Sequence, residues 1–183
     1  MLKVVHVPNA VLIKKAEPVG RITKKIRKIV ADMEVALVNY SDPPGVGLAA
    51  PQVGIALRIF LVKPTPDDPT EVFINPIILK SEGDKMPLKR PKKSKNKKKR
   101  GELEGCLSVP RVWSPLKRPQ KVQVQWTDLE GQIHTEWFTG FRAVIVQHET
   151  DHIDGILFTR RALEQGSQLY REKDGELEKI DTL

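Results

Sequence analysis

The chain has 183 residues, 39% of them hydrophobic, which is the size of one ordinary domain with a core and excludes a wholly disordered protein. Its single cysteine excludes a disulfide-stapled scaffold, no apolar run reaches the ~18 residues of a membrane span, and the N-terminus lacks a signal peptide's apolar segment. We therefore expect a soluble, cytoplasmic protein with no membrane partner. The formal net charge of +8 comes from Lys85–Arg100, which holds ten basic residues and no acid.

The first half of the chain predicts a helix followed by strands. Apolar residues recur at helical spacing over Arg21–Tyr40, which indicates an amphipathic helix with one buried face. Ala56–Lys63 and Glu71–Lys80 are rich in Val, Ile and Phe and are separated by a Pro/Asp loop. These two segments therefore predict neighbouring strands, and a hairpin between them is plausible.

A Lys-rich segment then interrupts the pattern. Lys85–Arg100 has no apolar period and repels itself, so we expect a flexible insertion at about 84–102 within a single domain spanning residues 1–183. Two interpretations stay open for it. It is either a solvated insertion or a contact with the ribosome, rRNA or another polyanion.

The second half of the chain predicts a hairpin and two helices. Lys121–Thr127 alternates apolar and polar residues, and a Gly-containing turn leads from it into Gln132–Phe138. Ala143–Ile153 has the pattern of a buried helix, and Leu163–Lys173 is expected to form a terminal helix.

The strongest local signal is the motif His148-Glu149-Thr150-Asp151-His152. On a helix the two histidines lie at i and i+4, so both rings can reach one metal ion. Glu149 projects beside them, where it can accept a proton from a metal-bound water. This spacing indicates a catalytic metal site rather than two unrelated histidines.

Two histidines need a third protein ligand, and the residues alone leave two candidates. Glu172 lies 24 residues after His148, a spacing that some helix-based metalloproteases use, although it belongs to a charged tail that we expect to be exposed. Cys106 lies in the apolar segment Glu104–Pro110. A Cys/His/His set suits Fe(II), Zn(II), Co(II) or Ni(II), because thiolate and imidazole are borderline-to-soft donors.

The third signal is the small-residue segment Gly45–Gln52. Glycine and alanine allow a substrate backbone to approach closely, and the amide of Gln52 offers a donor to an oxyanion. A tightly packed turn is the alternative interpretation of this segment.

Together these three segments strongly resemble the motifs of the peptide deformylase family. Gly45–Gln52 has the form Gly-apolar-Gly-apolar-Ala-Ala-x-Gln, Glu104–Ser108 has the form Glu-Gly-Cys-apolar-Ser, and Gln147–His152 has the form Gln-His-Glu-x-Asp-His. Their order and spacing also agree. The resemblance implies an α+β fold in which antiparallel strands pack around a central helix that carries the histidine motif.

The resemblance also implies an enzyme that removes the N-formyl group from the N-terminal formyl-methionine of nascent polypeptides and releases formate. Cys106, His148 and His152 would bind one divalent metal, expected to be Fe(II) in the native enzyme, with Zn(II), Ni(II) or Co(II) as substitutes. Metal-bound water would attack the formyl carbon with Glu149 as general base. Gln52 and the backbone N–H of Leu107 would hold the oxyanion.

The same likeness implies how the peptide binds. Backbone near Val46, Gly47 and Gly105 would pair with the peptide as an added strand. Val46, Phe141 and Val144 would form an apolar pocket for the methionine side chain. We expect a monomer.

Two other functions are kept beside this one. A two-histidine protease would use Glu172 as a ligand and need no role for Cys106. A ribosome-associated or RNA-binding module would hold a structural metal, which requires a fourth protein ligand that the spacing does not supply.

Overall fold

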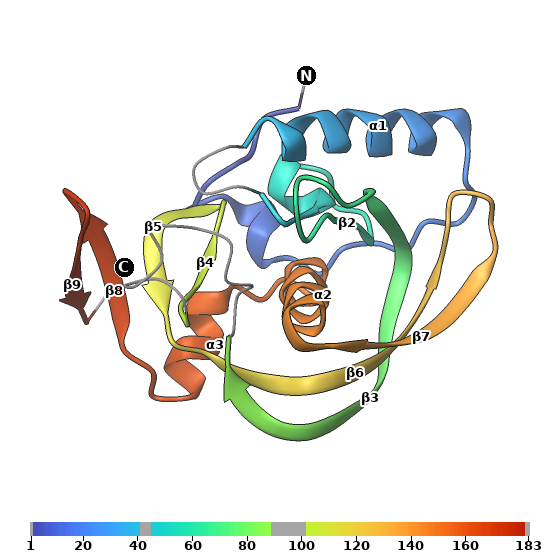
Figure 1. Cartoon of the computed structure of the whole chain (residues 1–183). Coiled ribbons are helices and arrows are strands. Elements are labelled where there is room, and N and C mark those ends of the chain that lie inside the picture. The colour runs from blue at the N-terminus through green and yellow to red at the C-terminus, as the bar shows by residue number, and fades with distance from the viewer. Residues whose placement is uncertain (1, 41–44, 89–101, 182–183) are drawn as a thin grey trace.

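The computed structural model describes residues 2–40, 45–88 and 102–181, and Figure 1 shows their arrangement. The strands form a five-stranded sheet in the order β1-β2-β3-β6-β7 and a four-stranded sheet in the order β4-β5-β8-β9. Every pair of neighbouring strands in these sheets is antiparallel. With the helices packed on them, the sheets confirm the predicted α+β fold.

The predicted N-terminal helix is confirmed as α1, Lys24–Val38. Thr23 caps it, because its hydroxyl oxygen accepts a hydrogen bond from the backbone N–H of Ile26 at 3.4 Å. The buried face packs onto the core beside β1 and β2. Two short 3₁₀ helices, η1 (Ala10–Ile13) and η2 (Ala50–Val53), complete the N-terminal half.

The five-stranded sheet contains both predicted hairpins. Its strands are β1 (Gly47–Ala49), β2 (Ile59–Val62), β3 (Glu71–Pro87), β6 (Lys117–Thr127) and β7 (Ile133–Thr139). β2 pairs with β3 and β6 pairs with β7, so both hairpins are confirmed.

The predicted start of the Lys-rich insertion is wrong. β3 continues to Pro87, and Lys85, Met86 and Pro87 pair with residues of β6. Met86 is half-buried and Leu88 is buried, which is the alternation expected of a strand. The lysines around these two residues obscured this alternation in the sequence. The remainder of the predicted insertion, residues 89–101, lies outside the described residues.

The predicted terminal helix at Leu163–Lys173 is also wrong. A helix, α3, covers Phe158–Glu164 instead, where Phe158 and Ala162 are buried. Gly166 has φ +61°, and a left-handed glycine ends a helix. The chain then forms the hairpin of β8 (Leu169–Lys173) and β9 (Glu176–Ile180), and β8 pairs with β5.

Helix α2, Gly140–Ile153, lies at the centre of the molecule, where Figure 1 shows it end-on above the curved strands β3, β6 and β7. Every residue from Ala143 to Ile153 is buried, and the helix contacts all five strands of the larger sheet. The other sheet carries β4 (Glu104–Cys106) and β5 (Val109–Ser114) beside it. No helix in the described part of the chain is long and apolar enough to cross a membrane.

The turn between β6 and β7 allows a test of how much a glycine stabilises this hairpin. Gly131 has φ +84°, and no atom lies within 4 Å of the position that a Cβ would take. We expect Gly131→Ala to lower the free energy of unfolding in urea by about 1 kcal/mol, because an L side chain is strained in the left-handed region. Gly20→Ala is the matched control, since Gly20 also has open space but no left-handed φ. Equal effects of the two changes would contradict this account.

Candidate metal centre and active site

Three metal-binding side chains converge beside α2. His148 and His152 lie one helical turn apart with ring centroids 4.9 Å from each other. Cys106, the last residue of β4, has its Sγ atom 3.1 Å from Nε2 of His152. Ligand atoms of all three residues lie within 4.8 Å of one another. These are the three residues that the sequence analysis selected as ligands.

The donor set fits a borderline metal ion such as iron or zinc. One thiolate and two imidazoles can occupy three positions of a catalytic site and leave the fourth position open. Glu149 lies next to the cluster, and its Oε2 atom is buried without a hydrogen-bond partner among the described residues, as is Nδ1 of His152. A buried carboxylate oxygen of this kind calls for a further polar group, such as a water or a substrate atom, to complete its hydrogen bonds.

The electrostatics of the cluster favour metal binding. Burial opposes ionisation of the Cys106 thiol, but the charges and hydrogen bonds of His152 and His148 lower the pKa of Cys106 well below its usual range. The thiol is therefore held as the thiolate, which is the form that ligates metals. Burial raises the pKa of Glu149 to about 7. A carboxyl group with such a pKa can both accept and donate a proton near neutral pH.

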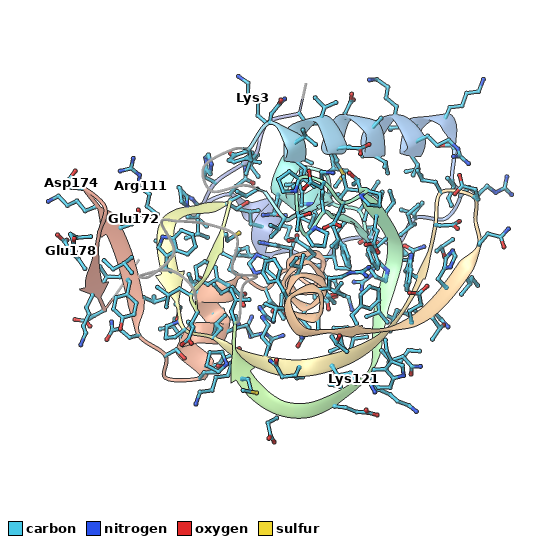
Figure 2. The ribbon with its side chains drawn as sticks, viewed as in Figure 1. Lys3, Arg111, Lys121, Glu172, Asp174 and Glu178 are labelled. Carbon is cyan, nitrogen blue, oxygen red and sulfur yellow. The ribbon has the colours of Figure 1, made fainter. Side chains whose placement is uncertain are left out.

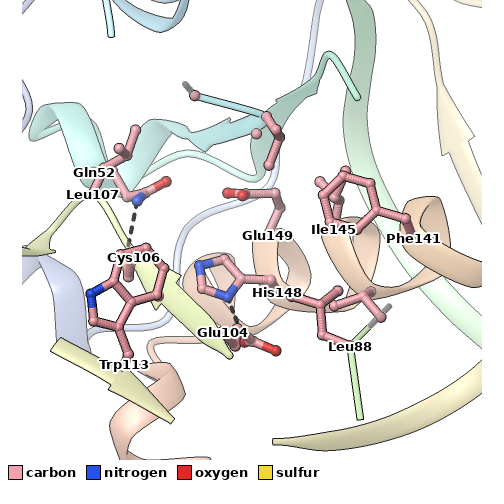
Figure 3. Close-up of a pocket in the computed structure, with 15 residues that line it drawn as sticks. Gln52, Leu88, Glu104, Cys106, Leu107, Trp113, Phe141, Ile145, His148 and Glu149 are labelled. Atoms are coloured by element: carbon pink, nitrogen blue, oxygen red, sulfur yellow. Dashed lines mark hydrogen bonds and ion pairs between the residues drawn. The ribbon is translucent and has the colours of Figure 1, made fainter. Parts of the chain in front are cut away.

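A buried network of ion pairs lies behind His148. Nδ1 of His148 donates a hydrogen bond to Oε1 of Glu104 at 2.7 Å (Figure 3). Arg118 donates two hydrogen bonds to the Glu104 carboxylate, at 2.8 and 2.7 Å, and a third to Asp151 at 2.9 Å. Arg161 donates to the other side of Asp151 at 2.7 Å. Because the Nδ1 atom of His148 is bonded to a carboxylate, its Nε2 atom is left to face the metal position.

The network also determines the charges of its members. Burial opposes ionisation of Glu104, but the charge of Arg118 outweighs it and holds the pKa of Glu104 well below its usual range. Burial likewise opposes the Arg118 cation, and the charges of Glu104 and Asp151 nevertheless raise the pKa of Arg118. Glu104 and Arg118 are thus a fully ionised pair inside the protein.

Gln52 has a defined orientation towards the site. It lies in η2 and is buried. Its Oε1 atom accepts a hydrogen bond from the backbone N–H of Ala49 at 2.8 Å, and its Nε2 atom donates to Sγ of Cys106 at 3.4 Å. The donor end of the amide therefore faces the metal-binding cluster, as Figure 3 shows.

One pocket opens onto this cluster. The sequence analysis expected a substrate pocket, and every residue that it named for catalysis or peptide binding lines this one: Val46, Gly47, Gln52, Gly105, Leu107, Phe141, Val144 and Glu149. Cys106 and His148 line it as well, whereas His152 is buried behind them. A Cβ atom on Gly47 would lie 2.4 Å from Oε1 of Glu149, so only glycine fits against that carboxylate.

Several residues of the site were not predicted from the sequence. Leu88 and Ile145 line the pocket, and Arg118 organises the ion pairs behind it. Trp113 lines the pocket as well. Arg118 gives no signal in the sequence, because it lies among polar residues of β6. Glu104 and Asp151 do give a signal, since both belong to the motifs quoted above. A motif does not indicate, however, which basic residue pairs with these carboxylates.

Glu172, the alternative third ligand, is absent from the metal-binding group found among the described residues. It lies on β8, half-buried rather than in an exposed tail, and its Oε2 atom accepts a hydrogen bond from Nε1 of Trp113 at 3.2 Å. The two-histidine protease therefore loses the ligand that it needs.

Known proteins are similar to this chain in sequence and in fold. The chain is 36% identical over 159 residues to the peptide deformylase of Afipia carboxidovorans, covering 85% of this chain and 83% of the relative. It is 36% identical over 174 residues to that of Desulforudis audaxviator, covering 95% and 99%. The crystal structure of a peptide deformylase from Synechococcus elongatus in complex with actinonin superposes with a TM-score of 0.73, at 32% identity and with 87% of this chain and 78% of that chain covered.

An α+β fold whose central helix places two histidines and a buried glutamate beside a cysteine of a neighbouring strand is typical of a metal-dependent hydrolase. The sequence model of the family described as polypeptide deformylase matches residues 1–168. The chain belongs to this family, whose members remove the N-formyl group from polypeptides.

The ion-pair network leads to a prediction about stability. Arg118→Ala leaves the Glu104 carboxylate buried without its cation, so we expect the free energy of unfolding to fall by about 3–5 kcal/mol. Urea denaturation of the metal-loaded protein measures the change. Arg160→Ala is the control, because Arg160 makes only an exposed i,i+4 pair with Glu164 and should cost less than about 0.5 kcal/mol. A loss below about 1 kcal/mol for Arg118→Ala would contradict the proposed importance of the pair.

Proposed function

We propose that the pocket binds the N-formyl-methionyl end of a nascent polypeptide and that the residues named above carry out its deformylation. The observation that carries this proposal is the convergence of Cys106, His148 and His152 on one point beside the carboxylate of Glu149. The reaction hydrolyses the formyl amide to formate and a free amino terminus. Each residue has a separate part in it.

Cys106, His148 and His152 would hold one divalent metal ion. When bound, the metal would act as a Lewis acid that lowers the pKa of a water molecule and polarises the formyl oxygen. We propose Fe(II) as the native ion, with Zn(II), Ni(II) or Co(II) as substitutes, because this ligand set accepts all four.

Glu149 would move the proton. Its unpartnered Oε2 atom can accept a proton from the attacking water, and the carboxyl group can then pass this proton to the departing amine. The close contact with Gly47 supports this role, since it fixes where the carboxylate lies.

Gln52 and Leu107 would stabilise the oxyanion. The Nε2 atom of Gln52 has the orientation of a donor towards the reacting group, because the carbonyl end is bonded to the backbone of Ala49. The backbone N–H of Leu107, directly after Cys106, would be a second donor. Loss of one such donor typically raises the barrier by about 2.7–4 kcal/mol.

The peptide would bind as an added strand. It would pair with the backbone of Val46 and Gly47 on one side of the pocket and of Gly105 on the other. Such pairing recognises the peptide by main-chain hydrogen bonds and therefore tolerates many side chains. Phe141 and Val144 of α2, with Val46, offer the apolar surface for the methionine side chain.

A variant of Glu149 tests this mechanism. We expect Glu149→Ala to bind metal as the parent does but to release formate from a formyl-Met peptide about 10²–10⁴-fold more slowly, because the proton acceptor is lost and no ligand is. Metal analysis and a formate-release assay measure the two properties. Cys106→Ser is the matched control and should lose both. Parental turnover in Glu149→Ala would exclude the glutamate as general base.

We further propose a single catalytic domain, monomeric and cytoplasmic, with the Lys-rich segment as an insertion that contacts the ribosome or rRNA. Two observations support the contact. The residues of 85–100 are strongly basic, and two described residues near the ends of the insertion, Leu88 directly before residues 89–101 and Glu104 three residues after them, both line the pocket. Polyanion binding at this edge would bring the pocket towards nascent chains.

The insertion can be tested by removing its charge at constant length. Replacing the Lys and Arg residues of 89–100 with Gln should leave formate release from a small formyl peptide within about twofold of the parent but weaken cosedimentation with ribosomes and its salt dependence. Replacing the exposed Lys24, Lys25 and Lys28 of α1 with Gln removes positive charge elsewhere on the surface and controls for the position of the charge. Unchanged ribosome binding at low salt would leave the segment as a solvated insertion.

A further inference from the structure

The C-terminal hairpin is joined to the strand that carries Cys106. The hairpin, β8–β9, covers Leu169–Ile180 and lies beyond residues 1–168, the part of the chain that the family model matches. Nevertheless β8 pairs with β5, and β5 pairs with β4, which ends at Cys106. A segment outside the matched region is therefore part of the same sheet as a residue of the proposed metal site.

The register of this sheet brings four residues to one face. Gly105 is opposite Trp113, and Trp113 is opposite Tyr170. Residues opposite each other in neighbouring strands share a face, and residues two apart in one strand do as well, so Glu172 belongs to the face of Trp113. The other face, with Val112 and Leu169, is buried in a separate apolar cluster.

On this face the indole ring of Trp113 covers Gly105. A Cβ atom on Gly105 would lie 2.6 Å from both Cε3 and Cζ3 of the ring, so the ring rests directly against the glycine backbone. Trp113 also lines the pocket beside Cys106, as Figure 3 shows. A peptide that pairs with β4 at Gly105 would meet this ring with the side chains that point to the same face.

Glu172 fixes the opposite edge of the ring. Its Oε2 atom accepts a hydrogen bond from Nε1 of Trp113 at 3.2 Å. Nε1 and the Cε3–Cζ3 edge lie on opposite sides of an indole, so one side of the ring is held by the hairpin and the other by the glycine backbone. Figure 2 shows Glu172 with Asp174 and Glu178 on the hairpin, beside Arg111 of β5.

We propose that Glu172 is a positioning residue and Trp113 a specificity-determining residue, through which the C-terminal hairpin makes the pocket prefer apolar or aromatic side chains after the formyl-methionine. This proposal rests on the function proposed above. Only 5% of Trp113 is exposed, so the ring meets the peptide with the edge that lines the pocket, and the Glu172 carboxylate keeps that edge in place. The preference belongs to binding and not to the chemical step, since neither residue is one of the proposed ligands, bases or oxyanion donors.

The experiment compares three substrates, formyl-Met-Ala-Ala, formyl-Met-Phe-Ala and formyl-Met-Ala-Phe, with the metal-loaded enzyme. We expect the parent to hydrolyse at least one Phe peptide with a lower KM than formyl-Met-Ala-Ala. Glu172→Ala should raise that KM about five- to tenfold, the worth of one hydrogen bond, with kcat and the Ala peptide within about twofold of the parent.

Four further variants separate positioning from a general structural effect. Trp113→Phe keeps an apolar ring but lacks the N–H donor, so it should match Glu172→Ala, and the double variant should show no additional loss. Glu172→Gln retains an acceptor and should restore the preference. Glu178→Ala, on the neighbouring strand β9 and exposed, should behave as the parent.

The outcomes distinguish this proposal from the function on which it rests. If Glu172→Ala leaves the preference for Phe intact, or lowers kcat equally on all three peptides, or adds fully to Trp113→Phe, the positioning role is wrong. If the parent releases no formate from any of the three peptides, the proposed function fails, and this inference fails with it.

Discussion

The active site depends on one buried cation. The guanidinium of Arg118, from β6, bonds the Glu104 carboxylate of β4 and the Asp151 carboxylate of α2. These are the elements that carry the cysteine and the histidines, and they belong to different parts of the fold. Because a buried carboxylate without a partner is strongly unfavourable, the three elements can pack only with the guanidinium between them. The same contact orients His148 through Glu104.

The residues around Arg118 explain how a polar site is stable inside an apolar core. All residues of α2 from Ala143 to Ile153 are buried, including two histidines, Glu149 and Asp151. Most of their polar side-chain atoms are paired with another residue, and the buried exceptions among the described atoms of α2 are Oε2 of Glu149 and Nδ1 of His152. The buried polar groups of α2 are therefore concentrated where chemistry needs them, while its buried apolar residues Ala143, Ile145, Val146 and Ile153 pack against the larger sheet.

Local patterns predicted much of this arrangement. His148 and His152 come together whenever their segment is a helix, and the run of apolar residues around them predicts that helix. Both features could therefore be predicted from a short stretch of sequence. The two hairpins of the larger sheet follow from alternation and turn residues in the same way. The roles proposed for Cys106, Gln52 and Leu107 rest on the three motifs together, because no single motif indicates that segments so far apart in the chain meet.

The predictions that were wrong concern features that depend on contacts between distant segments of the chain. β8 was assigned to a helix because its partner β5 lies over fifty residues away and leaves no trace in the local pattern. Arg118 could not be recognised for the same reason, since its importance depends on Glu104 and Asp151. At the end of β3, the alternation of Met86 and Leu88 was present in the sequence but was outweighed by the lysines around it.

Leu88 and Glu104 lie at the same pocket, and this geometry bears on how the protein tolerates variation. The chain leaves the described part of the structure after Leu88 and returns to it at Glu102. Leu88 is buried and Glu104 is held by Arg118, so both flanks of this segment are fixed by contacts among the described residues. A change in the length or charge of the sequence between these flanks therefore leaves those contacts in place.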